Sequence, residues 1–236
     1  MPTVMITGAN RGLGIEFAKQ YAADGWEVLA TTREPGNSKE LTKFGKMNPR
    51  VMVHKLDIAD DKSVQHLADA LDGKPIDVLI HNSGVYPREG QKTGQIDYQG
   101  WREAIETNLF GTMRVTEALL ENVAASERKQ IVAISSGMGS LRAVQGGAVA
   151  QSGTSYQYRT SKTALNMAMS ILAKELAPRA ISVVLIDPGW VKTDMGGPHA
   201  QLTPEQSIAG IRKVLAGSPM EISGKFLGHD GGVRPW

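Results

Sequence analysis

The chain has no cysteine among its 236 residues. It therefore cannot form a disulfide, offer a thiolate nucleophile or hold a metal ion through cysteine sulfur. The five histidines, which are His54, His66, His81, His199 and His229, lack the close spacing of metal ligands. The sequence accordingly predicts no metal site and assigns solvated or structural roles to the histidines.

The net charge of the chain is small, and its apolar runs are short. Lysine and arginine outnumber aspartate and glutamate by 26 to 24, a net charge of +2, and the basic residues are scattered along the chain. This pattern argues against a nucleic-acid partner. No stretch is long enough to cross a bilayer. The first apolar run, residues 3–7, is short and is followed by a glycine-rich segment, unlike a secretion signal. We therefore expect a cytoplasmic protein without a nucleic-acid or membrane partner.

The sequence alternates short apolar runs with segments of helical periodicity. The apolar runs predict strands near residues 3–7, 27–32, 51–56, 77–81, 130–136, 181–187 and 224–228. The periodic segments predict helices near residues 13–24, 38–46, 61–71, 98–124, 157–177 and 204–216. The alternation favours a single α/β domain over residues 1–236, a doubly wound parallel sheet of seven strands with helices on both faces.

Ligands of such folds bind at the carboxyl ends of the strands, near the point where the strand order reverses. Three long loops are expected around that cleft, over residues 86–97, 138–155 and 191–203. Loops at the rim of a site shape substrate choice more than chemistry. We assign the substrate-loop region to about residues 191–203.

A glycine-rich turn follows the first predicted strand. Gly8, Gly12 and Gly14 have the spacing Gly-x-x-x-Gly-x-Gly directly before the first predicted helix. Glycine allows a tight turn and a close approach of the backbone to a ligand. The helix N-terminus adds free N–H groups and the positive end of a dipole. The turn predicts a pyrophosphate site; a packing turn without a ligand is the alternative.

Tyr158 and Lys162 form the second informative motif. They are four residues apart, so their side chains share one face of a helix. A nearby ammonium favours a phenolate, and we predict that Lys162 lowers the pKa of Tyr158 from about 10 toward neutrality. The phenol then becomes a proton donor for a substrate carbonyl. Taken alone, such a pair also occurs on helices without a catalytic role.

Together, the turn Thr7-Gly8-x-x-x-Gly12-x-Gly14 and the pair Tyr158-x-x-x-Lys162 resemble the short-chain dehydrogenase/reductase family. The other family motifs follow in order over essentially the whole chain: Asp57 after the third strand, Asn82-Ser83-Gly84 after the fourth, Asn108 within a helix, Ser135-Ser136 after the fifth strand, and Pro188-Gly189-Trp190-Val191-Lys192-Thr193 after the sixth. The Pro-Gly-Trp-Val-x-Thr-Asp-Met stretch and the Ser-Gly-Lys-Phe ending are most similar to the carbonyl reductase, sniffer and C-factor-like branch. His81 and Ser83 depart from the family's Asn-Asn-Ala-Gly pattern, which predicts different local hydrogen bonding.

The resemblance implies roles for four catalytic residues. Tyr158 would donate the proton, Lys162 would hold the nicotinamide ribose, and Ser136 would bind the substrate oxygen. Asn108 would connect Lys162 to solvent through a water molecule. The implied cofactor-binding residues are Tyr158 and Lys162 again, with Gly8, Asn10, Arg11, Gly12, Leu13, Gly14, Arg33, Asp57, Ile58, Asn82, Ser83, Gly84, Pro188, Gly189, Val191 and Thr193.

The end of the second strand bears on the choice of cofactor. Thr32 stands where an acid would bind the ribose hydroxyls of NAD, and Arg33 follows it. Arg33 and Arg11 are guanidinium groups, whose planar forks suit the 2′-phosphate of NADP. The sequence therefore favours NADP(H), while Glu34 could reach a free ribose and leaves NAD(H) open.

These inferences predict an NADP-dependent carbonyl reductase that transfers hydride between the nicotinamide and a small carbonyl or alcohol substrate. The alternatives are an NAD-dependent alcohol dehydrogenase and a dinucleotide-binding sensor or C-factor-like signalling protein. The substrate stays open, and Tyr86, Met138, Trp190 and Met195 are candidate pocket residues that ordinary packing explains equally well. Many relatives pair through the two long helices, so a homodimer or homotetramer is expected.

Overall fold

The computed structural model of the chain describes residues 1–87, 92–146 and 155–236. Its strands are β1 (Thr3–Ile6), β2 (Glu27–Thr32), β3 (Val51–Lys55), β4 (Val78–His81), β5 (Gln130–Ile134), β6 (Ser182–Asp187) and β7 (Phe226–Gly228). They form one sheet in the order β3-β2-β1-β4-β5-β6-β7, and every pairing is parallel. The order reverses between β1 and β4. The predicted doubly wound fold is confirmed, and each strand lies within two residues of its predicted bounds.

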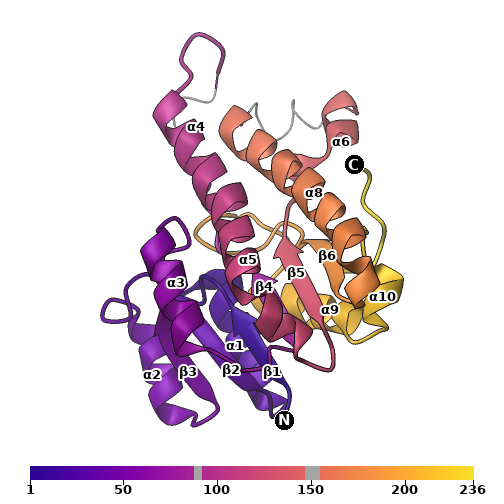
Figure 1. Cartoon of the computed structure of the whole chain (residues 1–236). Coiled ribbons are helices and arrows are strands. Elements are labelled where there is room, and N and C mark those ends of the chain that lie inside the picture. The colour runs from indigo at the N-terminus through magenta and orange to yellow at the C-terminus, as the bar shows by residue number, and fades with distance from the viewer. Residues whose placement is uncertain (88–91, 147–154) are drawn as a thin grey trace.

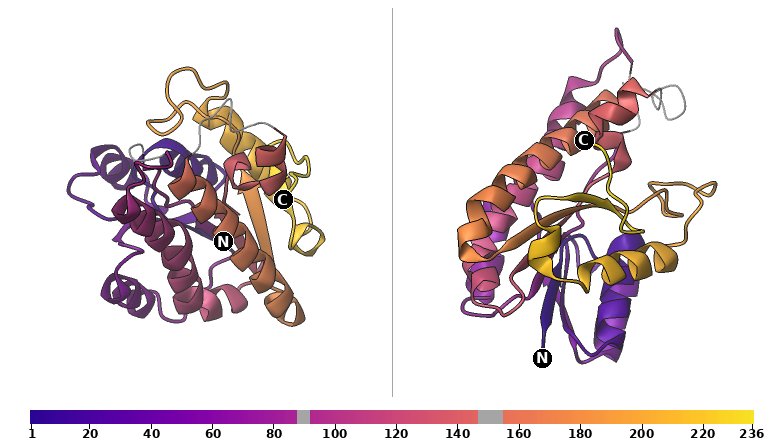
Figure 2. Two further views of the ribbon diagram at one scale, coloured as in Figure 1. Left: turned by 90° about the horizontal axis from the view of Figure 1, so that it is seen from above. Right: turned by 90° about the vertical axis from the view of Figure 1, so that its right-hand side faces the viewer.

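Helices cover both faces of the sheet (Figures 1 and 2). One face is covered by α3 (Asp61–Ala70), α5 (Gly111–Ala124) and α8 (Tyr156–Leu176). On the same side, α4 (Tyr98–Ile105) extends beyond the sheet and packs against α8. The other face is covered by α1 (Gly12–Ala23), α2 (Lys39–Met47) and α9 (Pro204–Leu215). The short helix α6 (Leu141–Gln145) lies outside these layers, whereas α10 (Pro219–Ile222) packs against the second core through Ile222. Among the described helices, none is both long enough and apolar enough to span a membrane.

Each strand contributes to two hydrophobic cores because neighbouring side chains point to opposite faces. In β1, Met5 packs beneath α3, α5 and α8, whereas Val4 and Ile6 pack beneath α1 and α9. All three side chains are fully buried. Burial on both faces explains why the strands read as continuous apolar runs in the sequence. The sheet is thereby a rigid platform for the loops at its carboxyl edge.

Two predicted segments differ from the structure. The helix predicted over 98–124 is interrupted by a π-helical segment, η1 (Glu106–Phe110), between α4 and α5. Such bulges are frequent at functional sites. The loop predicted over 138–155 contains α6 and most of the 3₁₀ turn η2 (Gly137–Gly139), which are too short to give a periodic signal. Parts of two predicted loops, residues 88–91 and 147–154, lie outside the described residues.

Candidate active site

The glycine turn between β1 and α1 is closed by backbone contacts that exclude larger residues. Gly8 and Gly12 have left-handed φ angles of 66° and 56°, which glycine adopts without steric cost. A β-carbon on Gly14 would lie 2.2 Å from the carbonyl oxygen of Gly8. Arg11, the N-cap of α1, gives no capping hydrogen bond from its side chain within the described structure. The uncapped helix end and the close-packed glycines fit a pyrophosphate group.

We expect the substitution Gly14→Ala to lower the free energy of unfolding by about 2–3 kcal/mol, because its methyl group meets fixed backbone. Dinucleotide affinity should fall at least about tenfold if the turn shifts by a few tenths of an ångström. Gly36→Ala is the matched control: a β-carbon there meets nothing within 4 Å. Thermal unfolding and dinucleotide titration of both variants check this expectation. Equal stability of the two would contradict it.

Asn82 ties the segment after β4 to the glycine turn. Its Nδ2 donates to the carbonyl oxygens of Thr7 at 3.0 Å and of Gly8 at 2.9 Å. The backbone N–H groups of Asn82 and Ser83 both donate to Thr7 Oγ1 at 3.0 Å. These bonds cross the point where the strand order reverses. They hold Gly8, Asn82 and Ser83 at one edge, as expected for a dinucleotide site.

His81, which departs from the family pattern, points away from that edge. Its Nε2 lies 2.9 Å from the hydroxyl of Thr116 on α5. Complete burial lowers the pKa of His81 to about 3, so the imidazole is neutral at physiological pH. The histidine at position 81 therefore affects the hydrogen bonding to α5, and the contacts of Asn82 with the glycine turn are retained.

Tyr158 and Lys162 lie together on α8, and both are buried. Lys162 Nζ lies 5.7 Å from the centroid of the Tyr158 ring and donates to the carbonyl oxygen of Ile134 at 2.8 Å. A β-carbon on Gly84 would be 3.6 Å from the same Nζ. The structure thus brings the ends of β4 and β5 against the Tyr158–Lys162 face of α8.

The predicted lowering of the Tyr158 pKa is wrong for this structure. Burial raises the pKa of Tyr158 to about 12; a hydrogen bond with Ser136 opposes the rise and the charge of Asp187 adds to it. Burial also lowers the pKa of Lys162 to about 8. The prediction assumed a solvated, fully charged lysine beside the phenol, whereas desolvation disfavours both charged forms. At neutral pH the phenol is protonated, the form that a proton donor requires.

Ser136 follows β5 and begins η2. Its Oγ accepts a hydrogen bond from the N–H of Met138 at 3.1 Å and interacts with the Tyr158 hydroxyl. In η2, a β-carbon on Gly139 would lie 2.9 Å from Lys162 Cβ, so the turn is packed closely on α8. The predicted catalytic residues Ser136, Tyr158 and Lys162 are therefore neighbours in space.

Asn108 lies in η1 and is fully buried. Its Oδ1 accepts from the N–H of Val85 at 2.8 Å, and its Nδ2 donates to the carbonyl of Val85 at 3.0 Å and to Ser161 Oγ at 2.9 Å. The side chain therefore clamps the segment after β4 to α8. The sequence predicted a water-mediated role for Asn108. It did not predict these direct hydrogen bonds, because they join residues that are far apart in the chain.

The end of β2 holds the residues on which the choice between NADP(H) and NAD(H) depends. Thr32 is buried, and its hydroxyl lies 2.8 Å from that of Ser38. Arg33 is exposed and forms no hydrogen bond or ion pair with any residue that the structure describes. The carboxylate of Glu34 accepts a hydrogen bond from Asn37 Nδ2. Arg11 forms an ion pair with Asp194, so of these two arginines Arg33 is the one without an ion pair to a described residue.

The remaining predicted cofactor residues lie at the same carboxyl edge. Asp57 lies two residues after the end of β3, and its Oδ1 accepts from the N–H of Ala59 at 3.0 Å. The loop 191–203 is closed by a bridge between Val191 and Leu202. A β-carbon on Gly12 would lie 3.3 Å from the Thr193 methyl group. The other members of the set, at or beside these segments, are Asn10, Leu13, Ile58, Pro188 and Gly189.

Tyr86 contacts the catalytic candidates more closely than the sequence indicated. Its ring centroid lies 4.7 Å from that of Tyr158, and its hydroxyl lies 2.6 Å from Ser155 Oγ. Ser155 is the N-cap of α8 and has a left-handed φ of 40°, a strained conformation for a non-glycine residue. Tyr86 therefore forms one wall beside the Tyr158 phenol and is bonded to the start of the helix that carries it.

Asp187, at the end of β6, is a site residue that sequence reasoning missed. Its Oδ1 accepts from the N–H of Gly137 at 3.0 Å, next to Ser136. Its charge also acts on Tyr158. In the sequence, Asp187 could have been noticed as an acid at a strand end directly before the Pro-Gly motif. The residue that it binds could not be identified from the sequence.

Comparison with known proteins gives consistent matches. The family described as short chain dehydrogenase matches residues 2–202. The C-signal of Myxococcus xanthus is 39% identical over 165 residues, covering 69% of this chain and 93% of that protein. The NADPH-bound carbonyl reductase from chicken fatty liver has a TM-score of 0.92 and 30% identity, covering 100% of this chain and 99% of the other. The carbonyl reductase Sniffer of D. melanogaster has a TM-score of 0.90 and 28% identity, covering 100% of both chains.

Proposed function

The chain belongs to the short chain dehydrogenase family of oxidoreductases, as its motifs predicted, and we propose that it is an NADP(H)-dependent reductase of small aldehydes or ketones. One observation carries the proposal. A buried, protonated Tyr158 lies between Ser136 and Lys162 at the carboxyl edge of the sheet. A proton donor held beside a hydroxyl group and an ammonium is suited to accepting a carbonyl oxygen and protonating it as negative charge develops.

In the proposed reaction the bound nicotinamide supplies the hydride that adds to the carbonyl carbon. The Ser136 hydroxyl orients the carbonyl oxygen. The Tyr158 hydroxyl gives its proton to that oxygen as the carbon–oxygen double bond becomes a single bond, so the product is an alcohol. Lys162, positively charged below a pKa of about 8, stabilises the phenolate that is left until the proton is replaced.

The protonation state of Tyr158 suits the role of acid in the reductive direction. A general base for alcohol oxidation must be deprotonated before it acts, and burial raises the pKa of Tyr158 to about 12. A general acid must be protonated, which Tyr158 is throughout the physiological pH range. At physiological pH the free site therefore holds Tyr158 in the form that carbonyl reduction uses.

The proposed cofactor site follows the carboxyl ends of β1 to β4. The turn of Gly8, Gly12 and Gly14 fits the pyrophosphate, and the exposed guanidinium of Arg33 is available to the 2′-phosphate of NADP. The buried hydroxyl of Thr32 is bonded to Ser38 and does not replace an acid at the ribose. Two structural neighbours, the chicken carbonyl reductase and a Burkholderia multivorans protein, contain NADPH or NADP.

We expect Arg33→Ala to weaken NADPH binding by about 10- to 100-fold, because charge-assisted hydrogen bonds to the 2′-phosphate contribute roughly 1.5–3 kcal/mol. NADH lacks this phosphate, so its affinity should stay within about threefold of the wild-type value. The two dissociation constants are measured by fluorescence titration. Arg50→Ala removes another exposed arginine, at the amino end of β3 and therefore at the opposite edge of the sheet, and should change neither dissociation constant. An equal loss for both cofactors would contradict the assignment of Arg33.

We also propose that residues 1–236 form one domain and that residues 191–203 are its substrate loop. Trp190, directly before this loop, is 52% exposed, and Met195 within it is 43% exposed. An apolar group of the substrate could contact both side chains. Exposed apolar side chains also lie on the segments predicted to pair: Phe110 at the end of η1, and Met167 and Ile171 on α8. These surfaces support the prediction of a homodimer or homotetramer, which sedimentation would test.

The function is tested by NADPH oxidation against a panel of aldehydes, diketones, quinones and cyclic ketones. We expect turnover of at least one class. Tight NADPH binding with no turnover across the panel would instead favour a dinucleotide sensor.

Signalling is the second candidate function, and the 39% identity to C-signal favours it. Tyr158→Phe separates the two in a complementation assay. A signal that needs only dinucleotide binding survives this substitution, whereas a phenotype that depends on reduction is lost.

A further inference from the structure

We propose that Asp187 and Arg234 form a positioning pair that fixes the turn carrying Ser136, so that the segment after β7 becomes part of the active-site support. The inference rests on the proposed reductase function. Neither residue touches the reacting atoms in this proposal. They act through the backbone of Gly137, the residue that follows Ser136.

Asp187 is placed to hold that turn. It ends β6 beside the end of β5, and its side chain is only 15% exposed. Oδ1 accepts from the N–H of Gly137 at 3.0 Å and from the N–H of Gly189 at 3.3 Å. A carboxylate that accepts backbone N–H groups forms stronger bonds than a neutral acceptor. One side chain therefore joins the Ser136 turn to the Pro188-Gly189 motif, on which cofactor and substrate contacts are expected.

Arg234 supplies the other half of the pair. Its Nε donates to Asp187 Oδ2 at 3.2 Å, and its Nη2 donates to Asp230 Oδ1 at 3.0 Å. A hairpin brings it there: the N–H of Arg234 donates to the carbonyl of Phe226 at 2.8 Å, and Leu227 pairs with Val233 in antiparallel fashion. The guanidinium thereby reaches the carboxyl end of β6 from the sheet edge formed by β7.

Gly228 leaves the space that the guanidinium occupies. A β-carbon on Gly228 would lie 2.0 Å from Arg234 Nη2 and 2.2 Å from its Cζ. Any larger residue would displace the arginine. Gly228 pairs with Asp187 in the sheet register, so the space that it leaves lies directly beside the carboxylate.

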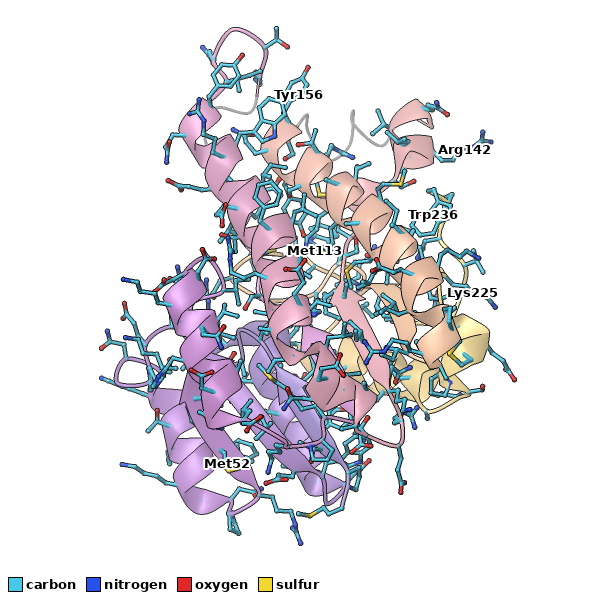
Figure 3. All side chains as sticks on the ribbon, viewed as in Figure 1. Met52, Met113, Arg142, Tyr156, Lys225 and Trp236 are labelled. Atoms are coloured by element: carbon cyan, nitrogen blue, oxygen red, sulfur yellow. The ribbon has the colours of Figure 1, made fainter. Side chains whose placement is uncertain are left out.

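The chain beyond Arg234 extends this support to the loop above the site. In Figures 1 and 3 the C-terminal segment runs past β6 and α8 toward α6, and Trp236 lies near Arg142. The N–H of Arg142 donates to the carbonyl oxygen of Trp236 at 2.9 Å, and the Trp236 ring packs 5.5 Å from that of Phe226. The C-terminal segment thus contacts β7 and α6 directly, and it is linked to the Ser136 turn through Asp187.

Charge gives the pair a second effect on the same site. A largely buried carboxylate without a cation is costly, and Asp187 acts on Tyr158 as a negative charge. Arg234 offsets that charge. Its loss would both loosen the Gly137 turn and leave Asp187 uncompensated beside the phenol.

The test compares Arg234→Met with Arg234→Lys and Gly228→Ala. We expect Arg234→Met to lower kcat by about 10- to 100-fold, as displacement of a positioned group does, with NADPH affinity within about twofold. Arg234→Lys should recover part of kcat, since it restores the charge without the fork. Gly228→Ala should reproduce the loss. Arg179→Met, which removes an exposed ion pair with Glu121, is the control and should change kcat less than about twofold.

A second readout does not depend on turnover. Hydrogen exchange at the Gly137 amide, followed by NMR, should become at least about tenfold faster in Arg234→Met while the melting temperature changes by only a few degrees. Unchanged exchange at Gly137, or a fall in kcat that only tracks global unfolding, would overturn the proposal. If the wild type reduces no carbonyl, the proposed function fails, and the exchange measurement still decides whether the pair fixes the turn.

Discussion

Tyr158→Phe is expected to lower kcat for carbonyl reduction by about 10²–10⁴-fold, the usual contribution of general acid catalysis. The substitution removes the one hydroxyl that can give a proton to the substrate oxygen in the proposed mechanism. The ring stays, together with its contact to Tyr86 at 4.7 Å. Dinucleotide affinity should therefore change less than about threefold, and the fold should be retained, because only one buried polar atom is lost.

Stopped-flow NADPH oxidation and dinucleotide titration measure the two quantities separately. Tyr156→Phe is the matched control on the same helix; its hydroxyl lies 3.1 Å from Thr93 Oγ1. This control should keep kcat within about twofold. A Tyr158→Phe variant that retains a tenth or more of wild-type kcat would remove Tyr158 from the role of proton donor.

Lys162→Met is expected to have opposite effects on activity and stability. Reduction should fall about 10²–10³-fold, because the charge that stabilises the phenolate is lost. The free energy of unfolding should rise by about 1–2 kcal/mol. A lysine whose pKa is lowered from 10.5 to about 8 by burial destabilises the folded state by roughly 3 kcal/mol below pH 8. The lost hydrogen bond to Ile134 offsets about 1 kcal/mol of the gain.

The pH dependence of this effect has a definite sign. The folded-state pKa of Lys162 is about 8 and its unfolded value is 10.5, so the unfolded chain binds more protons between these values. Wild-type stability therefore rises with pH in this window relative to Lys162→Met. The advantage of the variant is largest below about pH 8 and shrinks toward pH 10.5. Wild-type reduction should decline as pH rises through about 8, where the ammonium loses its proton.

Thermal unfolding from pH 6 to 10 and the pH profile of kcat/KM check both expectations. A change of 1–2 kcal/mol corresponds to a melting temperature about 2–8 °C higher in a domain of this size. Lys174→Met, at an exposed position on the same helix, controls for the loss of a surface charge. A variant less stable than the wild type at pH 7 would show that Lys162 is not a destabilising buried charge.

Much of the architecture could be predicted from local patterns. The apolar strand at residues 3–7 and the periodic helix at 13–24 gave the first β–α unit, and the spacing of Gly8, Gly12 and Gly14 indicated the turn between them. These signals are local because strand and helix periodicities extend over a few residues. The π-helical break at Asn108 escaped prediction, since η1 differs from a helix by its contacts with Val85 and Ser161 and not by periodicity.

The sequence by itself determined the chemical groups: a phenol and an ammonium four residues apart, a serine after a strand, and a threonine in place of an acid with an arginine after it. The tertiary structure decided their electrostatics. Distant segments cover Tyr158 and Lys162, and desolvation reversed the predicted direction of the tyrosine pKa. The tertiary structure also decided which residues support the catalytic groups. Asp187 and Arg234 are 47 positions apart in the chain, and only the fold brings them together. Burial and long-range partners depend on how the whole chain packs, and no local pattern encodes them.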